Sequence, residues 1–331
     1  MITPAPFGFP FWAARALALA VAVTLLSPAP AEDLPDRAPA GVYRAEAVAA
    51  SPKITGSGLA WWGDRLVVAD RGGKRLLAFT PPDHFETFAE ALTPVGVATG
   101  PDGSLVVVDR GEDGPRLLRF AADGKRTVIA SDDVGTPQFL AAHSSGTLYW
   151  SGFPDGGTRT LAPGGKPTAL AAKIGHTYGV ALSPKQDWLY VSSKLPNADR
   201  RGVWRFPLDA KGGPGEAEFF LRVQALEPDV PGLPAAKDGA KSLLGWVGRI
   251  QGIAVDSLGN LYVAGAESHT SGEAVAVVSP DGKKVVAMVL GVPRNVSGLA
   301  FGGADGRTLF VTGAGEYPLY QVRLPVRGAG R

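Results

Sequence analysis

A short phrase recurs along this chain, and its repetition restricts the possible folds more than any other feature. In residues 251–265 the phrase reads QGIAVDSLGNLYVAG. Apolar residues alternate with smaller or polar ones on both sides of SLGN, which is the pattern of two short strands joined by a turn. Gly259 suits that turn because glycine adopts a positive φ angle at little steric cost. The phrase therefore predicts an antiparallel hairpin.

Five further copies of the hairpin follow the same pattern, although the third places Phe139 where the others open with glycine. Each copy begins its second strand with a leucine, and these are Leu66, Leu105, Leu148, Leu189, Leu261 and Leu309. Intervals of roughly 40 to 70 residues are typical of propeller blades. Most hairpins are followed by a second strand pair, so each copy supplies four strands. The sequence predicts an all-β, six-bladed β-propeller.

The two ends of the repeat array predict how the ring closes. Residues 42–48 alternate like a strand but have no hairpin of their own, and the sixth copy has a third strand at 319–324 without a fourth. We therefore expect an N-terminal strand to complete the last blade, which removes exposed sheet edges. The propeller then spans residues 42–326, after a flexible lead-in over 32–41 and before a frayed end at 328–331.

The fourth copy carries an insertion at about residues 224–248, and its proline and glycine content excludes a further regular blade. Loops this long are usually functional or disordered. A lid over the pocket and a plain surface decoration both remain open.

Residues 1–31 are predicted to be a signal peptide. Arg15 precedes an apolar run of about eleven residues, which is too short to span a bilayer. Small residues at 29–31 suit a cleavage site, although an uncleaved anchor is the alternative. The absence of cysteine excludes disulfides and thiol chemistry. We expect a periplasmic or secreted protein that leaves the membrane after signal cleavage.

The charge of the chain restricts its partners. A net charge of +2 without a long basic run excludes nucleic-acid binding. We expect a monomer that binds a small-molecule ligand or substrate.

The hairpins also predict where a site lies. The two strands are antiparallel, so the residue before the first strand shares a face with the residue after the second, and these residues converge around the central channel. The six residues that precede the first strands, here called the leading positions, are Ser57, Val95, Gln138, Tyr178, Gln251 and Ser297. All but Val95 are candidate substrate-binding residues, together with Lys194 after a second strand. Candidate catalytic residues are His176, as a general base, and Glu267, beside His269.

Three of the repeated phrases resemble those of a known family. GVALSPKQDWLYVSS at 179–193, GIAVDSLGNLYVAG at 252–265 and GLAFGGADGRTLFVT at 298–312 are similar to the senescence-marker protein/gluconolactonase (regucalcin) family of six-bladed propellers. The resemblance implies a hydrolase that acts on a lactone or related small ester. It also implies a divalent, calcium-like cation, held by a Glu of the first blade, Asn residues of the middle blades and an Asp of the fifth.

This chain departs from that ligand set at the positions that match it. Ser57 stands in place of the Glu, Tyr178 in place of the fourth-blade Asn, and Gln251 in place of the Asp. Neutral oxygens alone bind a divalent cation weakly, so we expect the metal site to be lost or rebuilt.

A rebuilt site would take its metal ligands from Asp70, Asp109 or Glu267. Turn capping or ion pairing between blades is the alternative role of the two aspartates.

The alternative function of the whole protein is that of a non-catalytic propeller that binds a small molecule or a protein. A third hypothesis is a metal-free propeller similar to strictosidine synthase.

Overall fold

The computed structural model describes residues 35–90, 92–152, 157–170, 174–194, 202–222, 226, 230–233, 250–265, 274–313 and 315–330. The side chains of Ser57 and Lys194 lie outside this description. So do the predicted signal peptide, Glu267, His269 and most of the 224–248 insertion.

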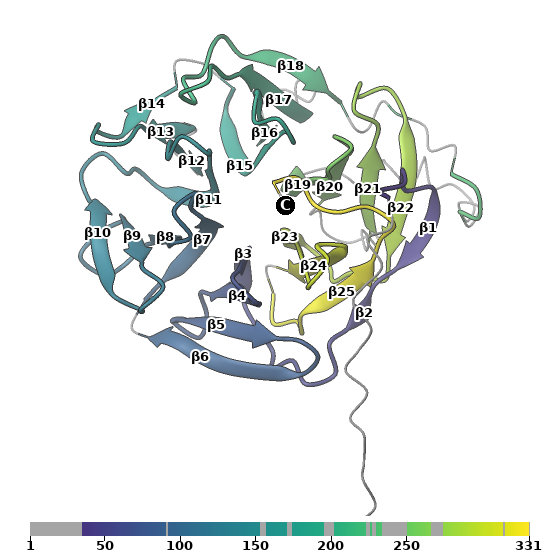
Figure 1. Cartoon of the computed structure of the whole chain (residues 1–331), viewed down its shortest axis with the longest axis horizontal. Coiled ribbons are helices and arrows are strands. Elements are labelled where there is room, and N and C mark those ends of the chain that lie inside the picture. Colours follow the sequence, from purple (N-terminus) through teal and green to yellow (C-terminus); the bar gives the residue numbers. More distant parts are fainter. Residues whose placement is uncertain are drawn as a thin grey trace, which may run out of the picture. The chain divides into compact units, whose positions relative to one another are not determined.

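Six sheets surround a central channel, and the innermost strand of each sheet is the first strand of a repeated hairpin (Figure 1). Blade one consists of β3 (Gly56–Trp62), β4 (Arg65–Asp70), β5 (Arg75–Thr80) and β6 (His84–Glu90). Blade two consists of β7 (Pro94–Thr99), β8 (Leu105–Asp109), β9 (Arg116–Phe120) and β10 (Arg126–Ala130). Blade three consists of β11 (Pro137–Ala142), β12 (Leu148–Gly152), β13 (Arg159–Leu161) and β14 (Thr168–Ala169).

The other three blades repeat this order. Blade four consists of β15 (His176–Leu182), β16 (Trp188–Lys194), β17 (Gly202–Pro207) and β18 (Glu218–Leu221). Blade five consists of β19 (Ile250–Val255), β20 (Leu261–Gly265), β21 (Ala274–Val278) and β22 (Val285–Leu290). Blade six consists of β23 (Val296–Gly302), β24 (Thr308–Gly313) and β25 (Tyr320–Arg323). The all-β, six-bladed prediction is confirmed.

The N-terminal segment closes the ring in two pieces. The strand β2 (Glu46–Ala47) pairs antiparallel with β25 and completes blade six, as predicted. The preceding strand β1 (Gly41–Arg44) instead pairs parallel with β22 and gives blade five a fifth strand. The segment that the sequence presents as one strand therefore joins two neighbouring blades.

The core lies between neighbouring blades. The four apolar residues of β8, LVVV at 105–108, are at most 1% exposed, because blade one covers one face of the sheet and blade three the other. Two-sided burial explains why second strands read as continuous apolar runs rather than as an alternation. No helix in the described part of the chain is long and apolar enough to cross a membrane.

The C-terminal tail, residues 325–330, runs back to the centre of the ring (Figure 1). The Gly328 amide donates to Gly306 O at 3.1 Å, and the Ala329 amide donates to Val255 O at 2.9 Å. The expectation of a frayed end is therefore wrong for Gly328 and Ala329. Composition suggested fraying, but these small residues fit where the tail touches the turns of blades five and six.

Asp36, in the predicted lead-in, holds the base of this tail. Its carboxylate accepts from the Arg327 amide at 3.1 Å, Arg307 Nη1 at 3.0 Å and Ser257 Oγ at 2.5 Å. The neighbouring Arg37 amide donates to Pro325 O at 3.1 Å. Asp36 and Arg37 therefore connect the N-terminal end of the propeller to its C-terminal end.

Candidate functional site

All six innermost strands are irregular at the same place. Where each pairs with the second strand of its blade, the register shifts close to its first residue. Such bulges bend a strand and re-aim its side chains, and they are common beside active sites. The bulges contain all six leading positions: Ser57, Val95, Gln138, Tyr178, Gln251 and Ser297. The end of the channel that these positions surround is here called the leading mouth.

The glycine that follows the leading position in most blades has a steric cause. A Cβ atom on Gly58 would lie 2.8 Å from Gly96 Cα, and one on Gly96 would lie 2.6 Å from Gln138 O. The backbone of each blade thus lies against the bulge of the next. Only glycine permits this approach. Phe139, which replaces the glycine in blade three, lines the channel.

Two side-chain amides at the leading mouth have unused hydrogen-bonding capacity. Gln138 and Gln251 are both half-buried. In the described part of the chain, neither amide group makes a hydrogen bond. Because burial makes an unsatisfied amide costly, these two groups are suited to bind a polar ligand.

Two serines that sequence reasoning missed support the bulges. Ser192 Oγ accepts from the Gly179 amide at 2.8 Å, and Ser151 Oγ accepts from the Phe139 amide at 3.1 Å. Both serines are fully buried. The sequence feature that could have identified them is a serine at the same place in the second strand of two blades, in LYWSG and LYVSS.

Three other leading positions, Ser297, Tyr178 and Val95, have buried side chains. Ser297 is 3% exposed, and its hydroxyl donates to Gly56 O at 2.9 Å, which ties blade six to blade one. Tyr178 is 6% exposed, and Val95 is fully buried. Ser297 is therefore a ring-closing residue, whose hydroxyl keeps only its acceptor capacity for a ligand.

The candidates His176 and Lys194 are directly opposite one another in blade four. They are register partners at the mouth-side ends of β15 and β16. The His176 side chain is half-buried. The predicted base and the predicted binding lysine thus share one edge of the leading mouth, while Glu267 lies outside the described residues.

Asp70 and Asp109 perform the same structural task in blades one and two. Asp70 accepts from the Thr55 and Gly73 amides at 3.2 and 3.1 Å and from Arg75 Nε at 3.0 Å. It has a side chain that is 3% exposed. The capping role is confirmed for Asp70, and its ion pair lies within the blade because Arg75 is on the adjacent strand.

Asp109 repeats this arrangement. It accepts from the Thr93 amide at 2.6 Å and from Arg116 Nε and Nη2 at 2.9 and 2.8 Å, with no exposed side-chain surface. The neighbouring Arg110 donates from Nε to Pro137 O of the next blade at 2.7 Å. This arginine therefore contacts the next blade through a main-chain carbonyl.

The described residues do not fit a calcium-like cation. Such an ion takes six to eight oxygen ligands that normally include several carboxylates. No group of three or more Asp, Glu or His side chains is arranged to hold a metal ion in the part of the chain that the structure describes. The two aspartates predicted as ligands, Asp70 and Asp109, already bind amides and arginines.

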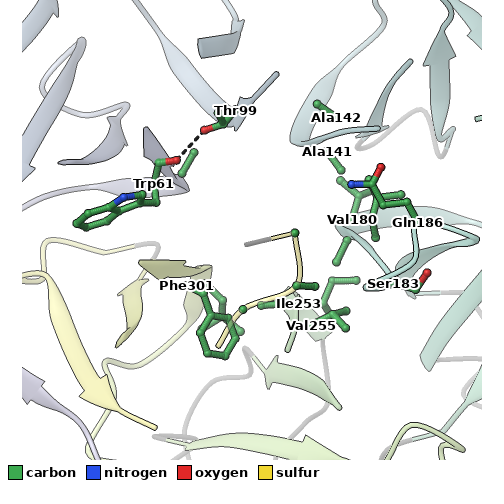
Figure 2. Close-up of a pocket in the computed structure, with 18 residues that line it drawn as sticks. Trp61, Thr99, Ala141, Ala142, Val180, Ser183, Gln186, Ile253, Val255 and Phe301 are labelled. Atoms are coloured by element: carbon green, nitrogen blue, oxygen red, sulfur yellow. Dashed lines mark hydrogen bonds between the residues drawn. The ribbon is translucent and has the colours of Figure 1, made fainter. Parts of the chain in front are cut away.

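The channel narrows below the leading mouth. A cavity of about 40 Å³ is lined there by one branched apolar side chain from each blade: Leu59, Val97, Leu140, Val180, Ile253 and Leu299. This ring is here called the waist. Beyond it, toward the hairpin turns, the channel widens into a cavity of about 300 Å³, here called the turn-side cavity (Figure 2). The waist separates the two ends of the channel.

The described residues form a six-bladed ring with polar groups gathered at one channel mouth, which defines an all-β propeller. The chain belongs to the SMP-30/Gluconolactonase/LRE-like region family, whose model matches residues 55–315.

Two curated relatives are similar over part of their length. The chain is 26% identical over 243 residues to a protein of Zymomonas mobilis subsp. mobilis named gluconolactonase, covering 66% of this chain and 60% of that protein. It is 31% identical over 147 residues to a Pseudomonas putida protein named 6-deoxy-6-sulfogluconolactonase, covering 44% of this chain and 41% of that protein. The chain thus spans less than two thirds of either relative.

A solved structure shares the fold. The calcium-binding protein regucalcin of Agrobacterium tumefaciens strain C58 superposes with a TM-score of 0.64 at 21% identity, covering 88% of this chain and 97% of that one.

Proposed function

We propose that this protein hydrolyses a lactone or a related small ester at the leading mouth. The observation that carries the proposal is the pair of half-buried amides of Gln138 and Gln251, which form no hydrogen bond in the described part of the chain. They occupy bulges at the channel mouth of a propeller whose family includes proteins named gluconolactonase. An amide NH₂ group is a suitable donor to a lactone carbonyl or a sugar hydroxyl.

The proposed reaction uses groups of this mouth alone. His176 accepts a proton from a water molecule, whose oxygen attacks the carbonyl carbon of the lactone. Amide donors from Gln138 and Gln251 stabilise the negative charge that develops on the carbonyl oxygen. The ring carbon–oxygen bond then breaks, and the proton passes to the leaving oxygen. Lactone and water thus give one hydroxy acid, with no step assigned to a metal ion.

A non-catalytic binding function is favoured by a different observation. Asp70 and Asp109 are each bound to two or more protein donors, so neither supplies a free carboxylate to the mouth. Neutral hydrogen-bonding groups suit the capture of an uncharged ligand as well as its hydrolysis.

A lactone panel tests the proposal. Hydrolysis of γ- and δ-lactones, including glucono-δ-lactone, is followed by acid release with and without chelator. We expect turnover that chelator does not remove, and a loss of kcat of roughly 100-fold or more in His176→Asn. His84→Asn is the matched control, because His84 is an exposed histidine on β6.

Three outcomes would contradict the proposed reaction. They are the absence of turnover throughout the panel, turnover that chelator abolishes, and equal kcat in His176→Asn and wild type. Lactone binding without turnover, detected as a rise in melting temperature, would support the binding function instead.

A further inference from the structure

The hairpin turn of blade four differs from the other five in one residue. Each turn contains a residue with positive φ, and in five blades it is glycine: Gly63, Gly103, Gly146, Gly259 and Gly306. In blade four it is Gln186, with a φ of 57°. This conformation is sterically unfavourable for a residue that has a Cβ atom, and such residues often mark functional sites.

Hydrogen bonds to blade three fix the Gln186 side chain. Its Oε1 accepts from the Ser144 amide at 2.6 Å. Since a main-chain NH requires an acceptor, the oxygen must lie on that side, and the amide nitrogen Nε2 is directed the other way. Nε2 makes no hydrogen bond within the described part of the chain. Figure 2 shows this nitrogen turned toward Ala141, on the wall of the turn-side cavity.

Gln186 lies where two cavities adjoin. It lines both the turn-side cavity of about 300 Å³ and an outer cavity of about 480 Å³ over the turns of blades one to three. Trp61, Thr99, Ala142 and Gly330 also line both. The outer cavity therefore provides an entrance, and the Gln186 amide stands at its inner end. A volume near 300 Å³ is at the lower end of the range for small-molecule sites.

The described lining of both cavities contains no charged side chain. No Asp, Glu, Lys or Arg belongs to it among the described residues. The one histidine, His143, has both ring nitrogens engaged. Its Nδ1 accepts from the Ser145 amide at 3.0 Å, so Nε2 carries the proton that is donated to Gln186 O at 3.2 Å. Most residues of the turn-side lining have apolar side chains, including Ile253 and Phe301, while polar atoms provide the larger share of its surface.

The C-terminal tail supplies one wall of the turn-side cavity through Gly328, Ala329 and Gly330. The hydrogen bonds of Gly328 and Ala329 to the turns of blades five and six, and the contacts of Asp36 with Arg327, hold this wall in place. The wall is thus part of the folded propeller.

We propose that the turn-side cavity is a second ligand site, which binds a compact, uncharged molecule with an apolar body and one hydrogen-bond acceptor oxygen. The body contacts the apolar side chains of the lining, and the acceptor oxygen receives a hydrogen bond from Gln186 Nε2. The waist separates this site from the leading mouth, so it is independent of the proposed hydrolysis.

Cyclohexanone is a suitable probe because it combines an apolar ring with one carbonyl oxygen. Binding is measured by titration with two-dimensional NMR, in which the side-chain amide signal of Gln186 and the main-chain signal of Gly330 report on the cavity. We expect saturable shifts of these signals in wild-type protein and none with cyclohexanecarboxylate, whose charge has no partner among the described lining residues.

Substitutions separate the amide from the shape of the turn. Gln186→Gly restores the residue found in the other five blades, and we expect it to keep the fold and to weaken cyclohexanone binding roughly 3- to 10-fold, the range of one hydrogen bond. Ala142→Leu should reduce binding by filling space where the two cavities adjoin. Asp133→Gly is the matched control, because Asp133 has a φ of 57° and is exposed on a loop away from both cavities.

The proposal is overturned if cyclohexanone produces no shift at Gln186 or Gly330, if cyclohexanecarboxylate binds equally well, or if Gln186→Gly retains wild-type affinity. Shifts confined to the leading mouth would likewise overturn it. Weakening by both Gln186→Gly and Ala142→Leu, with Asp133→Gly unchanged, would establish the site.

Discussion

Asp36 is predicted to join the two ends of the propeller through its charge. Its side chain is 17% exposed, and that of Arg307, which it contacts at 3.0 Å, is 8% exposed. In Asp36→Asn, Arg307 keeps Asp305 at 3.9 Å and Pro325 O but loses the carboxylate at 3.0 Å. Hydrogen bonds to charged groups contribute about 1.5–3 kcal/mol each. We expect Asp36→Asn to lower the free energy of unfolding by about 2–3 kcal/mol at pH 7.

The pH dependence of this loss follows from the pKa of Asp36. Burial opposes ionisation, but hydrogen bonds from Ser257 and the Arg327 amide, with the charges of Arg307 and Arg327, outweigh it and hold the pKa below its ordinary value. A carboxyl group with a lowered folded-state pKa adds stability above its unfolded pKa of about 3.9 and loses it as the pH falls through the folded value. The difference between wild type and Asp36→Asn should therefore be complete at pH 5.5–7 and shrink below about pH 4.

Urea unfolding at pH 7, 5.5 and 3.5 measures this difference. Glu112→Gln is the matched control, since it neutralises a side chain that is 90% exposed in its pair with Lys74. The control should cost at most about 1 kcal/mol. Equal losses in the two variants, or a difference that persists undiminished at pH 3.5, would refute the clamping role of Asp36.

Other predictions concern the blades, the bulges and the N-terminus. Asp109→Asn should lower the free energy of unfolding by about 3–5 kcal/mol in urea unfolding, because Arg116 loses its buried partner; a loss below about 1 kcal/mol would contradict this. Ser192→Ala should cost about 1–3 kcal/mol by leaving the buried Gly179 amide without its acceptor, and unchanged stability would refute the bulge-supporting role. We also propose export, so N-terminal sequencing of protein from an exporting host should begin near Glu32, whereas an intact Met1 in the membrane fraction would indicate an anchor.

The repeats made the ring predictable from the sequence. The hairpin recurs with a leucine at the start of each second strand, and the spacing of these leucines gives the repeat length. The glycine at the start of the hairpin reflects the close approach of Gly58 and Gly96 in the structure. The sequence pattern did not predict that the N-terminal segment divides into two strands in different blades. Residues 41–47 alternate throughout, and only the positions of β22 and β25 decide that one half joins each blade.

The site was predictable in position but not in chemistry. Antiparallel geometry places the leading residues at one mouth, and the bulges were found at those positions. Some side chains are already engaged by other parts of the protein: Asp109 binds Arg116 on the adjacent strand, and Ser297 binds the carbonyl of Gly56 in another blade. The strain at Gln186 was equally hidden, because a φ angle is set by the turn and not by the residue alone.

A calcium titration of the melting temperature tests the central claim, that the leading mouth recognises its ligand through neutral hydrogen-bonding groups. A cation that binds only the folded state must stabilise it. We predict the same melting temperature with chelator and with calcium up to about 1 mM, roughly 100 times a Kd of 10 μM. A rise that grows with calcium concentration, and that chelator reverses, would contradict the claim and show that a cation site persists in this propeller.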